Sequence, residues 1–136
     1  MIRLRTLKKG FAHFDAVAVN PRWAWSAQTP DGRTVVLTLW KDQIHHSGNK
    51  LKIDVFGDDV HFWKDLPGNR DRIKKLVHAR HSCDGLFRAV FVVAKDPKAR
   101  PRQILYRYIQ PTLVMKLTDL DERTGEFSEE SVDERR

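Results

Sequence analysis

The sequence contains a single cysteine, Cys83, so the chain cannot form an intramolecular disulfide. It also lacks any apolar run close to the roughly 18 residues that a membrane-spanning helix requires. Its first nine residues carry charges where a signal peptide needs an apolar centre. We therefore expect an intracellular, cytoplasmic protein with no membrane partner.

The chemical signatures of common enzymes are also missing. The seven glycines are scattered as turn formers and make no glycine-rich phosphate-binding loop. Acidic pairs occur at 58–59 and at Asp119 and Asp121, but neither is followed by the acid-x-Lys strand of metal-dependent nucleases. No second Cys or His pair stands at zinc-site spacing from Cys83. These absences predict a protein that is not an enzyme and that has no catalytic residues, no metal and no cofactor.

The charge is unevenly distributed along the chain. The formal net charge is +7, but residues 119–136 hold eight acidic and three basic residues, so the preceding 118 residues carry a net charge of +12. A body this basic favours a polyanionic partner, because each Lys or Arg that meets a phosphate releases condensed counterions. We expect nucleic acid, DNA in preference to RNA, with acidic protein surfaces and lipid headgroups as the alternatives.

The length of 136 residues suits one domain with its own hydrophobic core. No internal repeat or low-complexity block is visible, and the only shift in composition is the acidic end. We expect a single domain over residues 1–128 and an acidic, disordered tail over residues 129–136.

Short apolar segments bounded by turn residues predict a protein rich in β strands. One main helix is expected over residues 69–83, where apolar residues recur from Ile73 to Ala79 and Gly85 follows the end. Strands are expected at 14–19, 23–27, 34–41, 51–56, 86–94, 113–117 and 125–127, with a helical turn over 102–108. These elements predict an α+β fold, with a strongly curved or barrel-like mixed β sheet of six to seven strands and one main helix.

Basic residues gather on the expected helix and in the loop at 95–102. A helical wheel places Lys74, Lys75 and His78 opposite the apolar stripe that contains Ile73. We expect these two regions to contact the phosphates of the nucleic acid. The predicted phosphate-binding residues are Arg70, Lys74, Lys75, His78, Lys95, Lys98, Arg100 and Arg102.

Three of the four tryptophans lie in one expected hairpin, on either side of a turn at Asp31–Gly32. Because side chains two positions apart share a face of a strand, Trp23 and Trp25 should project side by side. Trp40 lies on the second strand, and the register of the hairpin decides whether it joins them. The fourth, Trp63, lies in a segment to which the pattern assigns no role.

Two parallel indoles form a wall that suits a flat heterocycle such as a nucleobase. The competing interpretation is that the rings simply pack in the core, and the basic charge of the body favours the base pocket over it. The polar groups expected at the margin of the pocket are Asn20, Arg22, Ser26, Asp42 and Asp54.

Six segments together resemble a known family, namely residues 20–26, 31–32, 35–42, 68–73, 87–96 and 117–127. They are similar to small bacterial modules of modification-dependent restriction systems and to the wider PUA-like superfamily, which includes EVE, YTH, ASCH and SRA-type domains. The resemblance spans residues 11–127 and implies a strongly bent, barrel-like sheet with an aromatic pocket. In this family the pocket receives one flipped-out base, often methylated or hydroxymethylated, so the resemblance implies a nucleic-acid-binding module that reads without cutting.

Two other functions stay open at this point. The tryptophan face and the acidic end could dock a separately encoded nuclease or methyltransferase, which would make the chain a protein-interaction subunit of a restriction or modification system. His45 and His46 with Asn49 also invite comparison with an HNH-like nuclease, but residues 51–56 have the pattern of a strand where that fold needs a helix.

Overall fold

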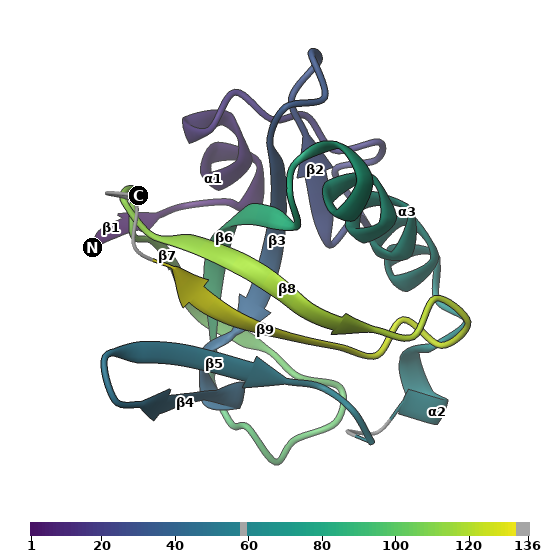
Figure 1. Cartoon of the computed structure of the whole chain (residues 1–136). Helices are drawn as coiled ribbons and strands as arrows, with labels where there is room; N and C mark the ends of the chain where they lie inside the picture. Colours follow the sequence, from purple (N-terminus) through teal and green to yellow (C-terminus); the bar gives the residue numbers. More distant parts are fainter. Residues whose placement is uncertain (58–59, 133–136) are drawn as a thin grey trace.

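The computed structural model describes residues 1–57 and 60–132 and is shown in Figure 1. The elements in chain order are β1 (Ile2–Leu4), α1 (Leu7–His13), β2 (Ser26–Gln28), β3 (Val35–Trp40), the 3-10 turn η1 (Lys41–Gln43), β4 (Ile44–Ser47), β5 (Lys50–Asp54), α2 (Val60–Trp63), α3 (Pro67–Ser82), β6 (Leu86–Ala94), β7 (Ile104–Ile109), β8 (Val114–Leu120) and β9 (Phe127–Val132). None of the described helices is long and apolar enough to cross a membrane.

Strand β6 is the centre of the sheet, because it pairs with three other strands. It runs parallel to β3 and antiparallel to β7 and β8. Seven strands follow the order β1-β7-β6-β8-β9-β5-β4, and β2 and β3 branch from β6, so the described residues form a nine-stranded sheet. In Figure 1 the β8 and β9 pair crosses over β3 and β6 instead of lying flat beside them. The predicted α+β fold, with a curled sheet and one main helix, is confirmed.

The curled sheet has apolar clusters on both of its faces. Val35, Leu37 and Leu39 of β3 point into the larger cluster, which α3 covers through Leu76. The alternate residue Val36 points the other way, into a smaller cluster under α1. Val36 is buried on this second face, whereas Thr38 and Trp40 further along the same face are partly exposed. The site described below lies where this double cover ends, at Trp40.

Three predicted elements differ from the structure. Residues 14–19 are not a strand; within them only Val17 makes an isolated bridge, to Gln28. The helical turn expected over 102–108 is instead strand β7, because β1 and β6 offer pairing partners on both of its edges. The first strand of the expected hairpin is shorter than predicted, since β2 begins only at Ser26.

The acidic end is structured further than expected. Residues 129–132, assigned to the disordered tail, belong to β9, which pairs with both β5 and β8. Its alternation places Phe127, Glu129 and Ser131 inward, so a buried glutamate replaces the solvated charge that the composition suggested. The rest of the predicted tail, 133–136, lies outside the described residues.

Candidate functional site

A cavity of about 480 Å³ lies at the end of β3 that carries Trp40. It is bounded by the segment 21–25, by α2, by the first turns of α3 and by the loop at 100–102. All four tryptophans of the chain line it, namely Trp23, Trp25, Trp40 and Trp63. The other apolar side chains of the lining are Leu7, Pro21, Ala24, Leu39, Val55, Phe62, Leu66, Val92, Pro101, Ile104 and Phe127.

The tryptophans reach the cavity by a route that the strand pattern did not predict. Trp23 lies in a turn, 38% exposed, and Trp25 lies just before β2, so the two do not share a strand face. The turn is held by the side chain of Asn20, whose Oδ1 accepts from the backbone N–H of Arg22 at 2.9 Å. Trp63, to which the sequence pattern gave no role, is carried to the same cavity by α2.

The indole of Trp25 lies directly against Gly68, in the first turn of α3. A Cβ atom at residue 68 would stand 2.5 Å from Cε2 and 2.6 Å from Nε1 of that indole. Glycine is therefore required at this position by the close approach of the ring, and this contact sets the position of the pocket wall relative to the helix.

Replacing Gly68 with alanine should displace the Trp25 ring and lower the free energy of unfolding by about 1–3 kcal/mol, as overpacking does. A loss of stability would be informative, because alanine is otherwise preferred to glycine inside a helix by about 1 kcal/mol. Urea unfolding and near-ultraviolet circular dichroism measure both effects. A smaller ring in the G68A/W25F double variant should recover part of the loss. A G68A protein as stable as the wild type, with unchanged aromatic dichroism, would contradict this packing.

Arg72 forms the buried, charged part of the cavity lining. Its side chain is 9% exposed, and its guanidinium carbon lies 5.0 Å from the ring centroid of Trp25, 5.3 Å from that of Trp63 and 4.9 Å from that of Phe127. Burial lowers the pKa of Arg72 to about 10, an effect that the neighbouring Glu129 opposes, so the guanidinium keeps its charge at neutral pH. An arginine in a helix is usually exposed, and the sequence pattern did not single out this one.

Asn69 holds Arg72 in place from a fully buried position. Its amide nitrogen donates to the carbonyl of Lys64 at 2.7 Å and to that of Thr124 at 2.8 Å, and its Oδ1 accepts from Nη2 of Arg72 at 3.1 Å. Asn69 was expected near the start of the helix. It lies there, as the third residue of α3, which begins at Pro67, and its side chain connects the helix to two loops.

Three further arginines, Arg22, Arg100 and Arg102, line the mouth of the cavity. Arg102 makes a two-pronged ion pair with Asp42, at 2.6 and 2.8 Å, while its guanidinium carbon lies 4.8 Å from the ring centroid of Trp40. No acidic residue is among the described residues that line the cavity. The site thus combines flat apolar walls with positive charge, which suits a flat ligand rich in hydrogen-bond acceptors.

The polar residues predicted for the pocket margin are mostly elsewhere. Arg22 lines the cavity, and Asp42 acts through Arg102. Ser26 is fully buried and donates to Asp71, and Asp54 is exposed and accepts from the backbone of Phe56. Asn20 shapes the turn before Trp23. The margin was predicted only from neighbours in sequence, whereas the lining also includes residues of α2, α3 and the loop at 100–102.

The predicted phosphate-binding set is divided by the structure. Lys75 is buried in an ion pair with Asp71 at 2.9 Å, so its assignment to an exposed face is wrong. The helical wheel failed here because α3 is buried over a wider arc than its apolar residues alone suggest. His78 contacts the carbonyl of Gly32 at 2.6 Å, at the other end of β3 from the cavity.

The remaining members of that set stay accessible to differing degrees. Lys74 is exposed on α3, and Arg70 donates to the carbonyl of Arg123. Lys95 and Lys98 are exposed in the loop that also brings Arg100 and Arg102 to the cavity.

The features of the alternative metal-dependent function lie apart from the cavity. His45 and His46 are exposed on strand β4 and not in a loop. No group of three or more His, Cys, Asp or Glu side chains within 1–57 and 60–132 is arranged to hold a metal ion. Comparison with known proteins adds no relative, since no family model, curated protein or solved structure matches the chain.

Proposed function

We propose that this protein is a non-catalytic nucleic-acid-binding module that holds one flipped base in the tryptophan-lined cavity, and that its curled sheet is of the PUA-like type. One observation carries the proposal. All four tryptophans meet in a single cavity whose described lining contains four arginines and no carboxylate.

The size and walls of the cavity suit one base. Its volume of about 480 Å³ falls within the range of about 300–1,000 Å³ that is usual for small-molecule sites. Flipping a base costs a few kcal/mol of stacking, and stacking on an aromatic side chain returns roughly 1–3 kcal/mol per base. Several indoles can therefore hold an extruded base, and the space left over accommodates a methyl or hydroxymethyl group.

The charge of the lining argues against a cationic ligand. Aromatic cages also bind quaternary ammonium groups, because the ring faces are electron-rich. Here Arg72 already occupies the faces of Trp25 and Trp63, and three more arginines stand at the mouth. Arg72 would repel a cation at these ring faces, whereas a nucleotide offers it acceptors and a phosphate.

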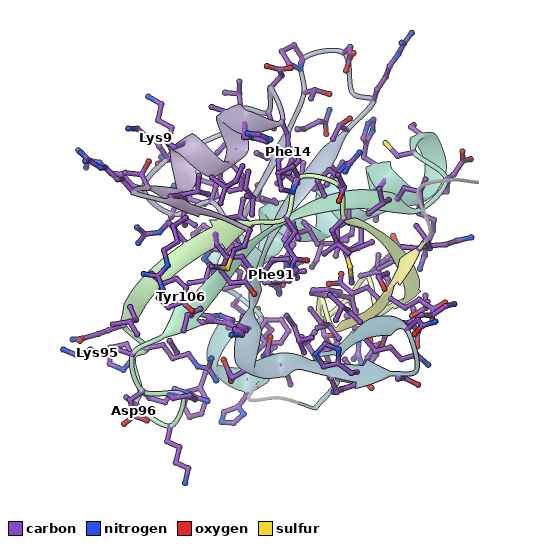
Figure 2. All side chains as sticks on the ribbon, turned by 90° about the vertical axis from the view of Figure 1, so that its left-hand side faces the viewer. Lys9, Phe14, Phe91, Lys95, Asp96 and Tyr106 are labelled. Carbon is purple, nitrogen blue, oxygen red and sulfur yellow. The ribbon has the colours of Figure 1, made fainter. Side chains whose placement is uncertain are left out.

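The nucleic-acid backbone has a basic path next to the cavity. Leu7 lines the cavity, so α1 begins beside it and exposes Lys8 and Lys9 there. Figure 2 shows Lys9 and Lys95 projecting from the same side of the molecule. We place the phosphate contacts along this side, from α1 to the loop that carries Lys95 and Lys98, in place of the α3 face that the helical wheel suggested.

Replacing Trp25 with alanine should weaken oligonucleotide binding by about 5- to 150-fold, which corresponds to the loss of roughly 1–3 kcal/mol of stacking. Binding is measured by fluorescence anisotropy on single- and double-stranded oligonucleotides that contain plain, methylated or hydroxymethylated bases. Phe56→Ala is the matched control, because that ring is 39% exposed and lies outside the cavity lining. Equal affinity of the wild type and the folded W25A protein for every oligonucleotide would refute the base pocket.

The protein-interaction alternative also has an observation in its favour. Phe62 and Leu66, at the margin of the cavity, are 66% and 45% exposed, which is unusual for large apolar side chains standing together. A separately encoded nuclease or methyltransferase could cover them. Under this alternative the F62A variant would lose a protein partner while the W25A variant would leave nucleic-acid binding unchanged.

A further inference from the structure

Arg72 has hydrogen-bonding capacity that the described protein does not use. Its Nη2 donates to Asn69, and Nε is buried without a partner among the described residues. A buried guanidinium with unused donors is costly, because each unpaired donor has lost its hydration. The same side chain lines the cavity, so a ligand that enters there can offer acceptors to its terminal nitrogens.

The surroundings hold this guanidinium in one orientation. The rings of Trp25, Trp63 and Phe127 stand about it at 4.9–5.3 Å, and Asn69 fixes one of its nitrogens through a side chain that is itself anchored by two carbonyls. A planar guanidinium group held in one orientation is preorganised to donate two parallel hydrogen bonds to neighbouring acceptors, a two-pronged contact.

The buried carboxyl group of Glu129, whose charge acts on Arg72, makes no hydrogen bond to that guanidinium. Neither oxygen of Glu129 has a hydrogen-bond partner, and its side chain is not part of the cavity lining. Desolvation raises the pKa of Glu129 well above its usual range, against the opposing charge of Arg72. The charge on Arg72 is therefore directed to the cavity and is not cancelled by a bonded carboxylate.

We infer that Arg72 is the specificity-determining residue of the cavity and that it selects guanine, an inference that rests on the proposed base-binding function. Guanine presents two neighbouring acceptors, O6 and N7, and a two-pronged contact from arginine to this pair is the commonest specific contact between proteins and bases. Adenine places an amino group beside N7, cytosine presents an amino group, and thymine presents a single oxygen beside a methyl group. Only guanine matches both prongs along this edge.

The test compares the four 5′-mononucleotides GMP, AMP, CMP and UMP by quenching of tryptophan fluorescence. All four carry the same phosphate and ribose. A difference in the midpoint of the titration, which is the nucleotide concentration at half-maximal quenching, therefore reflects the base. Midpoints, corrected for absorption by the nucleotide, are used because the depth of quenching differs between bases. We expect GMP to bind about 5- to 150-fold more tightly than AMP, the range set by one good two-pronged contact. 7-Deaza-GMP, which lacks the N7 acceptor, should lose most of this advantage.

The variant Arg72→Lys keeps the charge but removes the planar guanidinium group, so it should bind the four nucleotides with nearly equal affinity. Arg80→Lys, on the exposed face of the same helix and outside the cavity lining, is the matched control and should keep the preference for GMP. If R72K does not fold, the comparison of GMP with 7-deaza-GMP on the wild-type protein decides the question alone.

The possible outcomes distinguish a failure of this inference from a failure of the proposed base-binding function. Equal midpoints for all four nucleotides, or for GMP and 7-deaza-GMP, would overturn the role of Arg72 and leave the base pocket standing, provided that W25A still weakens binding. Absence of quenching by every nucleotide, together with oligonucleotide binding that W25A does not alter, would overturn both.

Discussion

Replacing Asp71 with asparagine should lower the free energy of unfolding by about 3–5 kcal/mol, because it leaves the ammonium group of Lys75 buried without its counter-charge. The ion pair between Lys75 Nζ and Asp71 Oδ1 is 2.9 Å long, and the side chains are only 11% and 9% exposed. The second oxygen of Asp71 accepts from the hydroxyl of Ser26 at 3.2 Å, so the carboxylate also ties α3 to β2.

Urea unfolding of D71N measures this loss, and the chain supplies an exposed pair for comparison. Arg80 and Glu122 are 3.6 Å apart with side chains 39% and 58% exposed, so Glu122→Gln should cost at most about 1 kcal/mol. The double variant D71L/K75M replaces the buried pair with apolar side chains of similar size and should recover most of the stability. A D71N protein as stable as E122Q would show that the buried pair contributes no more than a surface one.

This buried pair also explains two errors of the sequence-based prediction. Ser26 was expected at the pocket margin because it follows Trp25, and Lys75 was expected on an exposed face because it lies opposite Ile73. Both belong instead to a polar contact between α3 and β2. A helical wheel assumes that charged residues face water, and that assumption fails where a charge is paired inside the protein.

The elements that the sequence predicted well are those whose signal is local. Strand β6 was placed at its observed bounds, because Leu86–Ala94 is apolar at every position except Arg88 and the strand is paired and covered on both faces. Helix α1 was missed because Lys8, Lys9 and Gly10 interrupt any amphipathic pattern. Its start is fixed by Thr6, whose hydroxyl accepts from the N–H of Lys9, and Gly10 allows close packing on Val90.

The cavity was predictable only in part for the same reason. The clustering of Trp23, Trp25 and Trp40 in the sequence pointed to it, since all three lie in one expected hairpin. Trp63 and Arg72 reach it from α2 and α3, and no feature of their own segments indicates which neighbours they will meet. Contacts between distant segments depend on the tertiary fold, and residues of this kind complete the site.

The second large effect concerns Glu129, a buried carboxyl group. Desolvation raises its pKa in the folded protein, whereas its pKa in the unfolded chain is about 4.3. Between these two values the folded state holds a proton that the unfolded state has released. The contribution of Glu129 to stability is therefore fully present below its unfolded pKa and should fall by about 1.4 kcal/mol per pH unit as the pH rises towards the folded pKa.

Glu129→Gln should remove this decline, because an amide does not ionise and occupies nearly the same volume. Urea unfolding at a series of pH values above 4.3 should show E129Q gaining on the wild type as the pH rises, until the difference levels off at the folded pKa. Glu130→Gln is the matched control, since the next side chain along β9 faces outward and pairs with Lys50 at 3.1 Å. A difference between wild type and E129Q that stays constant with pH would mean that Glu129 is ionised in the folded protein. In that case its carboxylate would partly neutralise Arg72, and the positive charge assigned to the cavity would be weaker.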